Sequence, residues 1–293
     1  MKPSITLACI LLTTALTAQE CDIVAEGVVP QKAGTGYAFT EGPAVAKDGS
    51  VYFTDQPNDR IYRWDEQEGI SLWLEGTERS NGLYFNQEEK LVACADAQNR
   101  IILFECCKEQ KVLLEEFEDK HLNGPNDLWI APNGNIYFTD AYYHRPYWPE
   151  GYNEIQETRG VYLLRPNGEV TRVINDYKQP NGIIGTPDGK NLYVADIEER
   201  KIWRYEILPD GTLTGKTYFA PHGSDGMTID NRGNIYLTMG KVWVYSPEGE
   251  LISEIEVPES PSNLCFGGEE RDILFITART SVYTLKMKTR GVQ

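Results

Sequence analysis

The sequence has little histidine and little cysteine for its length. It contains three histidines in 293 residues, and its six cysteines include no Cys-x-x-Cys pair. Protein zinc sites are built largely from these two residue types, and small disulfide-bonded folds use cysteines at short regular spacings, so neither class is expected. We expect most of the thiols to pack as small apolar side chains and leave their disulfide status open: Cys21, Cys94, Cys106, Cys107 and Cys265.

Basic residues are also scarce relative to acidic ones. The chain has 28 Lys and Arg against 44 Asp and Glu, which gives a formal net charge of −16 at pH 7. A surface of this sign repels nucleic-acid phosphates and anionic lipid headgroups, so we predict neither a nucleic-acid partner nor a membrane partner. The same field attracts cations.

Long hydrophobic runs are missing outside the N-terminus. Residues 1–18 carry one lysine, an apolar run and small residues before Gln19, which is the pattern of a signal peptide and is too short to span a bilayer comfortably. A buried N-terminal strand is the alternative. We predict a signal peptide over 1–18, an exported protein that is periplasmic or secreted, and one domain over 19–293. Cys21 lacks the preceding small apolar residues of a lipid-anchored cysteine.

The sequence is rich in tyrosine and glycine, and one phrase recurs along it. The phrase reads as a strand, a polar turn and a second strand, and successive copies begin about 40 to 55 residues apart. Periods of this size with several strands per unit are typical of propeller blades. The six copies are 41–55, 81–96, 126–140, 181–196, 225–239 and 263–278.

Each phrase is followed by two more apolar segments, such as 60–65 and 70–76, joined by a polar turn. The last unit has only three segments, and 22–27 resembles the missing fourth. We therefore predict an all-β fold: a six-bladed β-propeller with four antiparallel strands per blade, closed by an N-terminal strand that completes the last blade.

The residues that begin the phrases should form a polar ring in the central channel. Antiparallel blades bring the start of every first strand to one rim, and the innermost strands face the axis. A ring of carboxylate and amide oxygens suits a hard cation such as Ca²⁺. Strand or turn capping is the alternative role for such residues. The ring consists of Glu41, Asn81, Asn126, Asn181, Asp225 and Asn263.

Several of these motifs resemble a known family. Glu41-Gly-Pro, Gly-Pro-Asn126-Asp, Pro-Asn181-Gly and Ser-Asp225-Gly, with their Tyr-Phe-Thr-Asp phrases, are similar to the gluconolactonase, senescence marker protein (regucalcin) and luciferin-regenerating enzyme family. Diisopropylfluorophosphatase and drug-responsive lactonase belong to the same wider group. The resemblance implies a six-bladed propeller with a catalytic divalent cation, usually Ca²⁺, with Zn²⁺, Mg²⁺ or Mn²⁺ as alternatives.

Carried over to this chain, the resemblance makes Glu41, Asn126, Asn181 and Asp225 the metal ligands. Asp225 and Asn126 are the predicted catalytic residues, with Asp225 activating water or serving as the base. Asn81 and Asn263 would line the channel or contact substrate. Asp127 points off the ring and could orient one of the metal ligands without binding the metal itself.

The predicted reaction is opening of a lactone, with the metal acting as a Lewis acid on the carbonyl oxygen. An organophosphate or phosphotriester hydrolase on the same metal is one alternative, and a non-catalytic binding propeller is another. Gly124 stands where regucalcin-like members carry a substrate-contacting arginine, so the resemblance does not fix the substrate beyond a sugar lactone or related ester.

One loop is much longer and more aromatic than its counterparts. It covers 141–159, where the first unit has only 56–59. Loops of this length are usually functional, and we predict that this one forms a wall over the pocket. Packing on a neighbouring blade is the alternative. The predicted wall residues are Tyr142, Tyr143, His144, Arg145 and Trp148, and two nearby rim histidines, His121 and His222, could assist proton transfer or simply be exposed.

Overall fold

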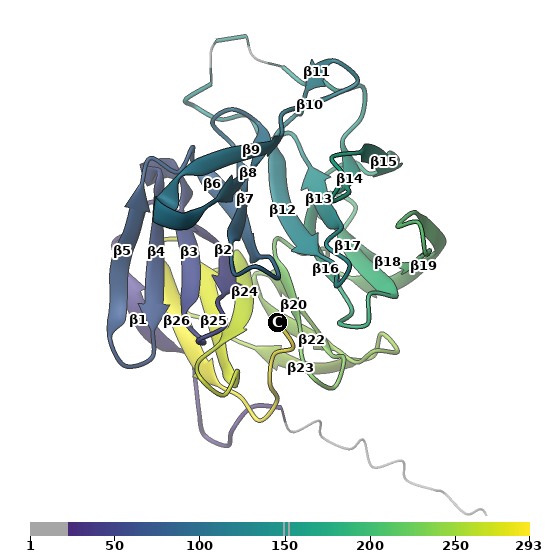
Figure 1. Cartoon of the computed structure of the whole chain (residues 1–293). Coiled ribbons are helices and arrows are strands. Elements are labelled where there is room, and N and C mark those ends of the chain that lie inside the picture. The colour runs from purple at the N-terminus through teal and green to yellow at the C-terminus, as the bar shows by residue number, and fades with distance from the viewer. Residues whose placement is uncertain (1–22, 149, 152) are drawn as a thin grey trace, which may run out of the picture.

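The computed structural model describes residues 23–148, 150–151 and 153–293. Within them the chain forms six four-stranded antiparallel sheets arranged around a central axis (Figure 1). The innermost strands of neighbouring sheets contact each other all the way around, from β2 to β6, β12, β16, β20, β24 and back to β2. The predicted six-bladed propeller is therefore confirmed.

The blades follow the chain in order. The first three are β2 (Thr40–Val45), β3 (Val51–Asp55), β4 (Arg60–Asp65) and β5 (Gly69–Glu75); β6 (Ser80–Phe85), β7 (Leu91–Ala95), β8 (Arg100–Phe104) and β9 (Gln110–Leu114); and β12 (Pro125–Ile130), β13 (Ile136–Asp140), β14 (Gly160–Leu164) and β15 (Val170–Ile174). Next come β16 (Pro180–Gly185), β17 (Asn191–Asp196), β18 (Lys201–Ile207) and β19 (Leu213–Pro221), then β20 (Met227–Ile229), β21 (Ile235–Met239), β22 (Lys241–Tyr245) and β23 (Leu251–Ile255). The last blade is β24 (Asn263–Gly267), β25 (Ile273–Ala278), β26 (Ser281–Lys286) and β1 (Gln31–Thr35).

The closing strand is N-terminal, as predicted, but its position is different. β1 (Gln31–Thr35) pairs with β26, whereas residues 22–27 had been expected to do so. Within 23–27, Val24 forms only an isolated bridge with Met287. Ile23 is buried and packs in the apolar cluster of the last two blades instead of joining the sheet. The apolar residues near the N-terminus thus fill a core rather than mark the outer strand.

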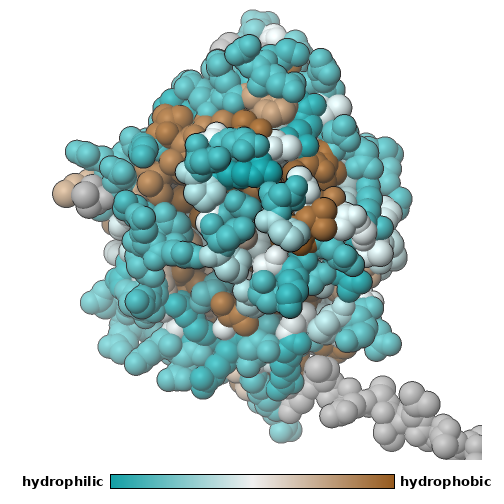
Figure 2. Space-filling view, turned by 45° about the vertical axis from the view of Figure 1, so that its right-hand side comes forward, coloured by the Kyte–Doolittle hydropathy of each residue, from teal (hydrophilic) through white to brown (hydrophobic). Residues whose placement is uncertain are grey.

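Burial falls from the axis outward and explains the sequence pattern of the blades. Every residue of β12 is buried, whereas the outer strand β5 is mostly exposed or half-buried. Inner strands are covered on both faces by neighbouring blades, so they read as nearly continuous apolar runs after their polar first residues. The face shown in Figure 2 is mostly hydrophilic, and its hydrophobic areas lie mainly in the upper half of the view, as suits a chain that is 25% charged.

The elements outside the blades are few in the described part of the chain. A small hairpin, β10 (Glu116–Phe117) and β11 (Lys120–His121), precedes the third blade, and two short 3-10 turns cover Gln56–Asn58 and Cys106–Lys108. No helix there is long and apolar enough to cross a membrane. Cys94 and Cys265 are buried free thiols and Cys107 is an exposed one. The predicted signal peptide, 1–18, lies outside the described residues.

Candidate metal centre in the central channel

The six phrase-starting residues meet at one end of the channel. Four of them line a cavity of about 240 Å³ together with Phe39, Gln56, Tyr143, Arg145 and Ile197; these four are Glu41, Asn81, Asn126 and Asp225. The other two adjoin it through hydrogen bonds, because Asn181 donates to Asp225 and Asn263 donates to Glu41 at 3.3 Å. The structure thus brings together the ring that strand direction predicts.

Asn181 is held in one orientation by two acceptors. Its Nδ2 donates to the Tyr143 hydroxyl and to Asp225 Oδ1, both at 2.8 Å. Its Oδ1 atom is buried and has no hydrogen-bond partner among the described residues, and the same holds for Oδ1 of Asn81. Buried side-chain oxygens nearly always have a partner, so each of these two ring residues has an oxygen available to a ligand.

Two buried carboxylates add negative charge to the same place. Burial, followed by the negative charge of Asp225, raises the pKa of Glu41 above its usual range. Burial raises the pKa of Asp225 to about 6, against the hydrogen bond from Asn181 and the positive charges of Arg145 and Arg279. Desolvated like charges of this kind are costly unless a cation offsets them.

The donor set fits a hard cation. The predicted ligands offer two carboxylates and two amide oxygens, which Ca²⁺ accepts in flexible geometry. No group of three or more His, Cys, Asp or Glu side chains in the described part of the chain is placed to hold a metal, so a histidine- or thiolate-based site does not fit. A cation bound here would be held by carboxylate and amide oxygens.

Glycine follows the ring residue in four of the six phrases, and the structure shows why. A Cβ atom on Gly42 would lie 1.9 Å from the backbone oxygen of Asn81, in the next blade. A Cβ atom on Gly226 would lie 1.9 Å from Asn263. The absence of a side chain therefore lets the inner strands of neighbouring blades approach each other closely at the ring.

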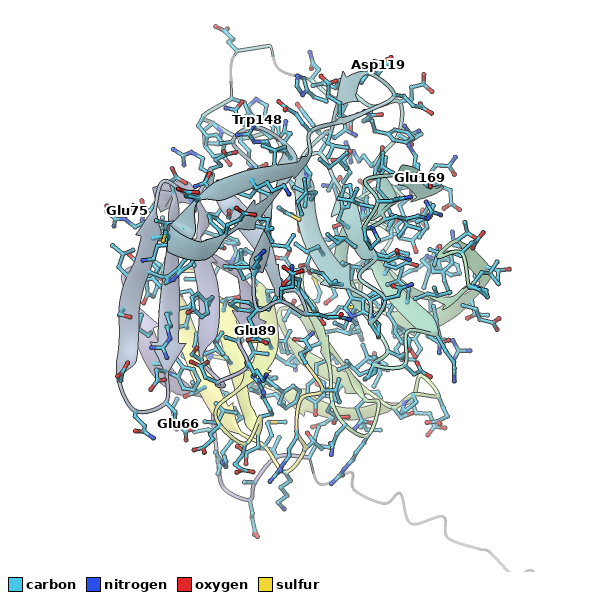
Figure 3. All side chains as sticks on the ribbon, in the orientation of Figure 1. Glu66, Glu75, Glu89, Asp119, Trp148 and Glu169 are labelled. Carbon is cyan, nitrogen blue, oxygen red and sulfur yellow. The ribbon has the colours of Figure 1, made fainter. Side chains whose placement is uncertain are left out.

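The tyrosine-rich loop reaches the site, as predicted for a wall. It runs from Ala141 to Arg159 between β13 and β14, and Tyr143 and Arg145 line the cavity. Tyr142 packs against Trp148 with ring centroids 5.8 Å apart. Figure 3 shows Trp148 in the upper part of the molecule, on the same side as Asp119 of the β10–β11 hairpin, and Glu66 and Glu89 lower down, on turns of the opposite rim.

Asp96 anchors this loop and was not identified from the sequence. It lies at the end of the second phrase, is 2% exposed, and accepts hydrogen bonds from Arg145 Nε at 2.7 Å and from the Tyr147 hydroxyl. Gln56 Nε2 donates to it at 2.5 Å, and its backbone oxygen accepts from Trp148 Nε1. Burial raises the pKa of Asp96, and Arg145 acts in the opposite direction.

A comparison of the blades explains why Asp96 is available. The phrase-ending aspartates of three other blades bind backbone N–H groups of the preceding connection: Asp55, Asp140 and Asp196. In the second blade Asp59 takes that role, since its Oδ1 accepts from the N–H groups of Thr77 and Arg79. In the sequence, the only signal of a different role for Asp96 was Asp59, an additional aspartate in the short loop 56–59.

Asp96→Asn should loosen the loop, because it removes the charge that pairs with Arg145. We expect a loss of about 2 kcal/mol in the free energy of unfolding and faster chymotryptic cleavage after Tyr142 and Tyr143. A double-mutant cycle with Arg145→Met, measured by urea unfolding, should show a coupling free energy of about 1 kcal/mol or more. Strictly additive effects would contradict the role of this ion pair.

The remaining predicted residues do not line this cavity. Asn263 and Asp127 line a small space of about 20 Å³ deeper in the channel, where burial raises the pKa of Asp127 to about 7. His144 is exposed and lines a second cavity at the mouth. His222 stacks on Trp243 with centroids 4.0 Å apart, and His121 is exposed beside Glu116, so neither faces the described cavities.

Gly124 lies under the loop. A Cβ atom there would meet the backbone oxygen of Ala141 at 3.0 Å and the Trp148 ring at 3.5 Å, and its φ of +156° is itself unfavourable for other residues. The loop thus occupies the space that a side chain at this position would need.

A six-bladed propeller with carboxylate and amide oxygens around one end of its channel is the class that the fold and site define. The chain belongs to the SMP-30/gluconolactonase/LRE-like family, whose model matches residues 39–280. It is 29% identical to the gluconolactonase of Zymomonas mobilis, over 86% of this chain and 80% of that protein. It is 24% identical to the pentonolactonase XacC of Haloferax volcanii, over 83% of this chain and 82% of that protein.

A solved structure of a gluconolactonase has the same architecture as this chain. The gluconolactonase of Xanthomonas campestris superposes with a TM-score of 0.84 at 26% identity. The match covers 90% of this chain and 91% of that one.

Proposed function

We propose that this protein hydrolyses a lactone at a divalent cation, Ca²⁺, bound by Glu41, Asn126, Asn181 and Asp225. The observation that carries the proposal is the orientation of Asn181, whose buried Oδ1 atom has no partner among the described residues while its Nδ2 is fixed by two acceptors. Family membership and the two sugar lactonases among its relatives support the reaction.

Each residue of the site has a distinct role in this proposed reaction. Asp225 accepts a proton from the attacking water, and Asn181 holds its carboxylate in position through the 2.8 Å hydrogen bond. The water oxygen bonds to the lactone carbonyl carbon, the ring C–O bond breaks, and the proton passes to the departing ring oxygen, giving a hydroxy acid. Asn126 lines the same cavity, which places its amide where it can contact the reacting group. A bound cation supplies Lewis-acid stabilisation of the oxyanion.

The Tyr143 hydroxyl and the Arg145 side chain cover this cavity from the loop. Burial raises the pKa of Tyr143 to about 12, so its hydroxyl stays protonated and can accept from Asn181 while donating elsewhere. The loop thus limits access of bulk water to the site.

Calcium binding should stabilise the protein. A ligand present at a hundred times its Kd adds about 2.7 kcal/mol to the free energy of unfolding, which corresponds to a rise in Tm of roughly 5 °C or more. Thermal unfolding with Ca²⁺ and with a chelator measures this shift, and NaCl at the same ionic strength is the control. No shift at millimolar Ca²⁺ would count against the proposed site.

A substrate panel tests the reaction. We expect turnover of sugar lactones that stops in chelator. Turnover of phosphotriesters without lactones would favour the organophosphate alternative, and binding of lactones without turnover would favour a binding propeller. Export remains a prediction that N-terminal sequencing of the mature protein would test.

A further inference from the structure

A second cavity opens at the mouth of the site. Its volume is about 550 Å³, within the usual range of about 300–1,000 Å³ for small-molecule sites, and it shares Phe39, Gln56 and Arg145 with the inner cavity. Its other lining residues are Pro57, Arg79, His144, Pro146 and Tyr147. The outer cavity is therefore adjacent to the inner one, and a ligand bound at the ring residues would lie next to it.

The charged side chains that line this outer cavity are basic, whereas the molecule as a whole is acidic. The chain has 44 acidic and 28 basic residues, yet the lining of the outer cavity includes two arginines and a histidine and no aspartate or glutamate. Arg279 adds a further positive charge, since its Cζ lies 5.8 Å from the ring of Phe39, which faces both cavities. The two carboxylates of the site, Glu41 and Asp225, line only the inner cavity.

Both lining arginines are fixed before any ligand arrives. Arg79 donates from Nη1 to the backbone oxygen of Pro57, and its Cζ lies 4.1 Å above the ring of Tyr147. No carboxylate in the described part of the chain lies within ion-pair distance of Arg79. Arg145 also lines the cavity and is held through Nε by the buried Asp96.

Fixed guanidinium groups in a partly enclosed space are suited to carboxylate and phosphate, because they can donate two parallel hydrogen bonds at little entropic cost. We propose that the outer cavity binds an anionic group of the substrate, so that the lactone opened by this protein carries a carboxylate or a phosphate away from its ring. This inference rests on the proposed lactone hydrolysis and names the substrate class of that site.

The experiment compares kcat/KM for three lactones on the calcium-loaded protein. They are gluconolactone, which is neutral, the monolactone of glucaric acid, which carries a carboxylate, and gluconolactone phosphorylated on its terminal hydroxyl. We expect at least one acidic lactone to exceed the neutral one by roughly tenfold or more. The better of the two distinguishes carboxylate from phosphate.

Arg79→Met tests the assignment to this cavity, because methionine keeps an apolar stem over Tyr147 and removes the charge. The ratio of kcat/KM for the acidic over the neutral lactone should fall roughly tenfold. Arg290→Met is the matched control, since Arg290 is exposed and its backbone oxygen binds Asn231 on the opposite rim. It should leave the ratio unchanged.

Wild-type protein gives a second reading that does not depend on any variant. The kcat/KM for the acidic lactone should fall as ionic strength rises, while that for the neutral lactone should not. Equal rates for acidic and neutral lactones, with no such salt dependence, would overturn the inference and leave the proposed function standing.

If no lactone is opened, the proposed function fails, and calorimetry then decides the subsite separately. Wild type should bind glucarate, a dianion, more tightly than gluconate, and Arg79→Met should lose this difference. Equal affinity of wild type for the two sugar acids would overturn the anion subsite.

Discussion

Asp225→Ala should lower kcat/KM for lactone hydrolysis at least about a thousandfold. The change removes a ligand of the proposed cation and the acceptor of the water proton together, and Lewis-acid stabilisation alone is worth several kcal/mol, about a factor of ten for each 1.4 kcal/mol. Steady-state kinetics with saturating Ca²⁺ measures the loss.

The same variant should keep its fold. Asp225 is a buried carboxylate next to Glu41, so its loss relieves repulsion in the metal-free protein, and Asn181 keeps its second acceptor, Tyr143. In chelator, its Tm should lie within about 3 °C of wild type, whereas the rise caused by Ca²⁺ should vanish. Asp176→Ala, at an exposed site, is the control. Wild-type activity in Asp225→Ala would remove the proposed centre.

Gly42→Ala should destabilise the propeller by about 4 kcal/mol or more, enough to prevent folding in many proteins of ordinary stability. The added methyl group would lie 1.9 Å from the backbone oxygen of Asn81, so the first two blades would have to separate. The φ of Gly42, +45°, adds the cost of a left-handed conformation.

Gly76→Ala measures the cost of the left-handed conformation alone. Gly76 also has a positive φ, +73°, but a Cβ atom there meets nothing within 4 Å. It should cost only about 1–2 kcal/mol. Soluble yield and urea unfolding of both variants measure the difference, which reports the contact between blades. Equal losses of stability in the two variants would mean that the close contact between Gly42 and Asn81 contributes nothing beyond the backbone conformation.

The repeated phrases predicted the blades correctly because inner strands are covered by neighbouring blades, so their polar first residues and apolar remainder are fixed by position. The outer strand β1 could not be found in this way. Its sequence, Gln31-Lys-Ala-Gly-Thr35, is almost fully exposed and carries no apolar alternation, whereas the apolar Ile23 packs in a core. Edge strands of this kind are specified by backbone pairing, which leaves little trace in side chains.

The site shows a similar division between sequence and structure. Strand direction predicts that Glu41, Asn126, Asn181 and Asp225 converge, because the repeat places each of them at the start of an inner strand. The orientation of Asn181 depends on Tyr143, which reaches it from a loop of another blade. The role of Asp96 depends on Asp59. In three other blades the phrase-ending aspartate binds backbone N–H groups, whereas here Asp59 binds them and leaves Asp96 available to the loop. Such roles follow from tertiary contacts and are invisible in a repeat.

The most direct test of the whole account is lactone hydrolysis by wild-type protein before chelation, after chelation and after Ca²⁺ is restored. The account predicts turnover that falls to the uncatalysed rate when the cation is removed and returns when Ca²⁺ is added back. Lactone turnover that persists undiminished in the chelated protein would contradict the proposed metal centre, and no turnover in any state would contradict the proposed reaction.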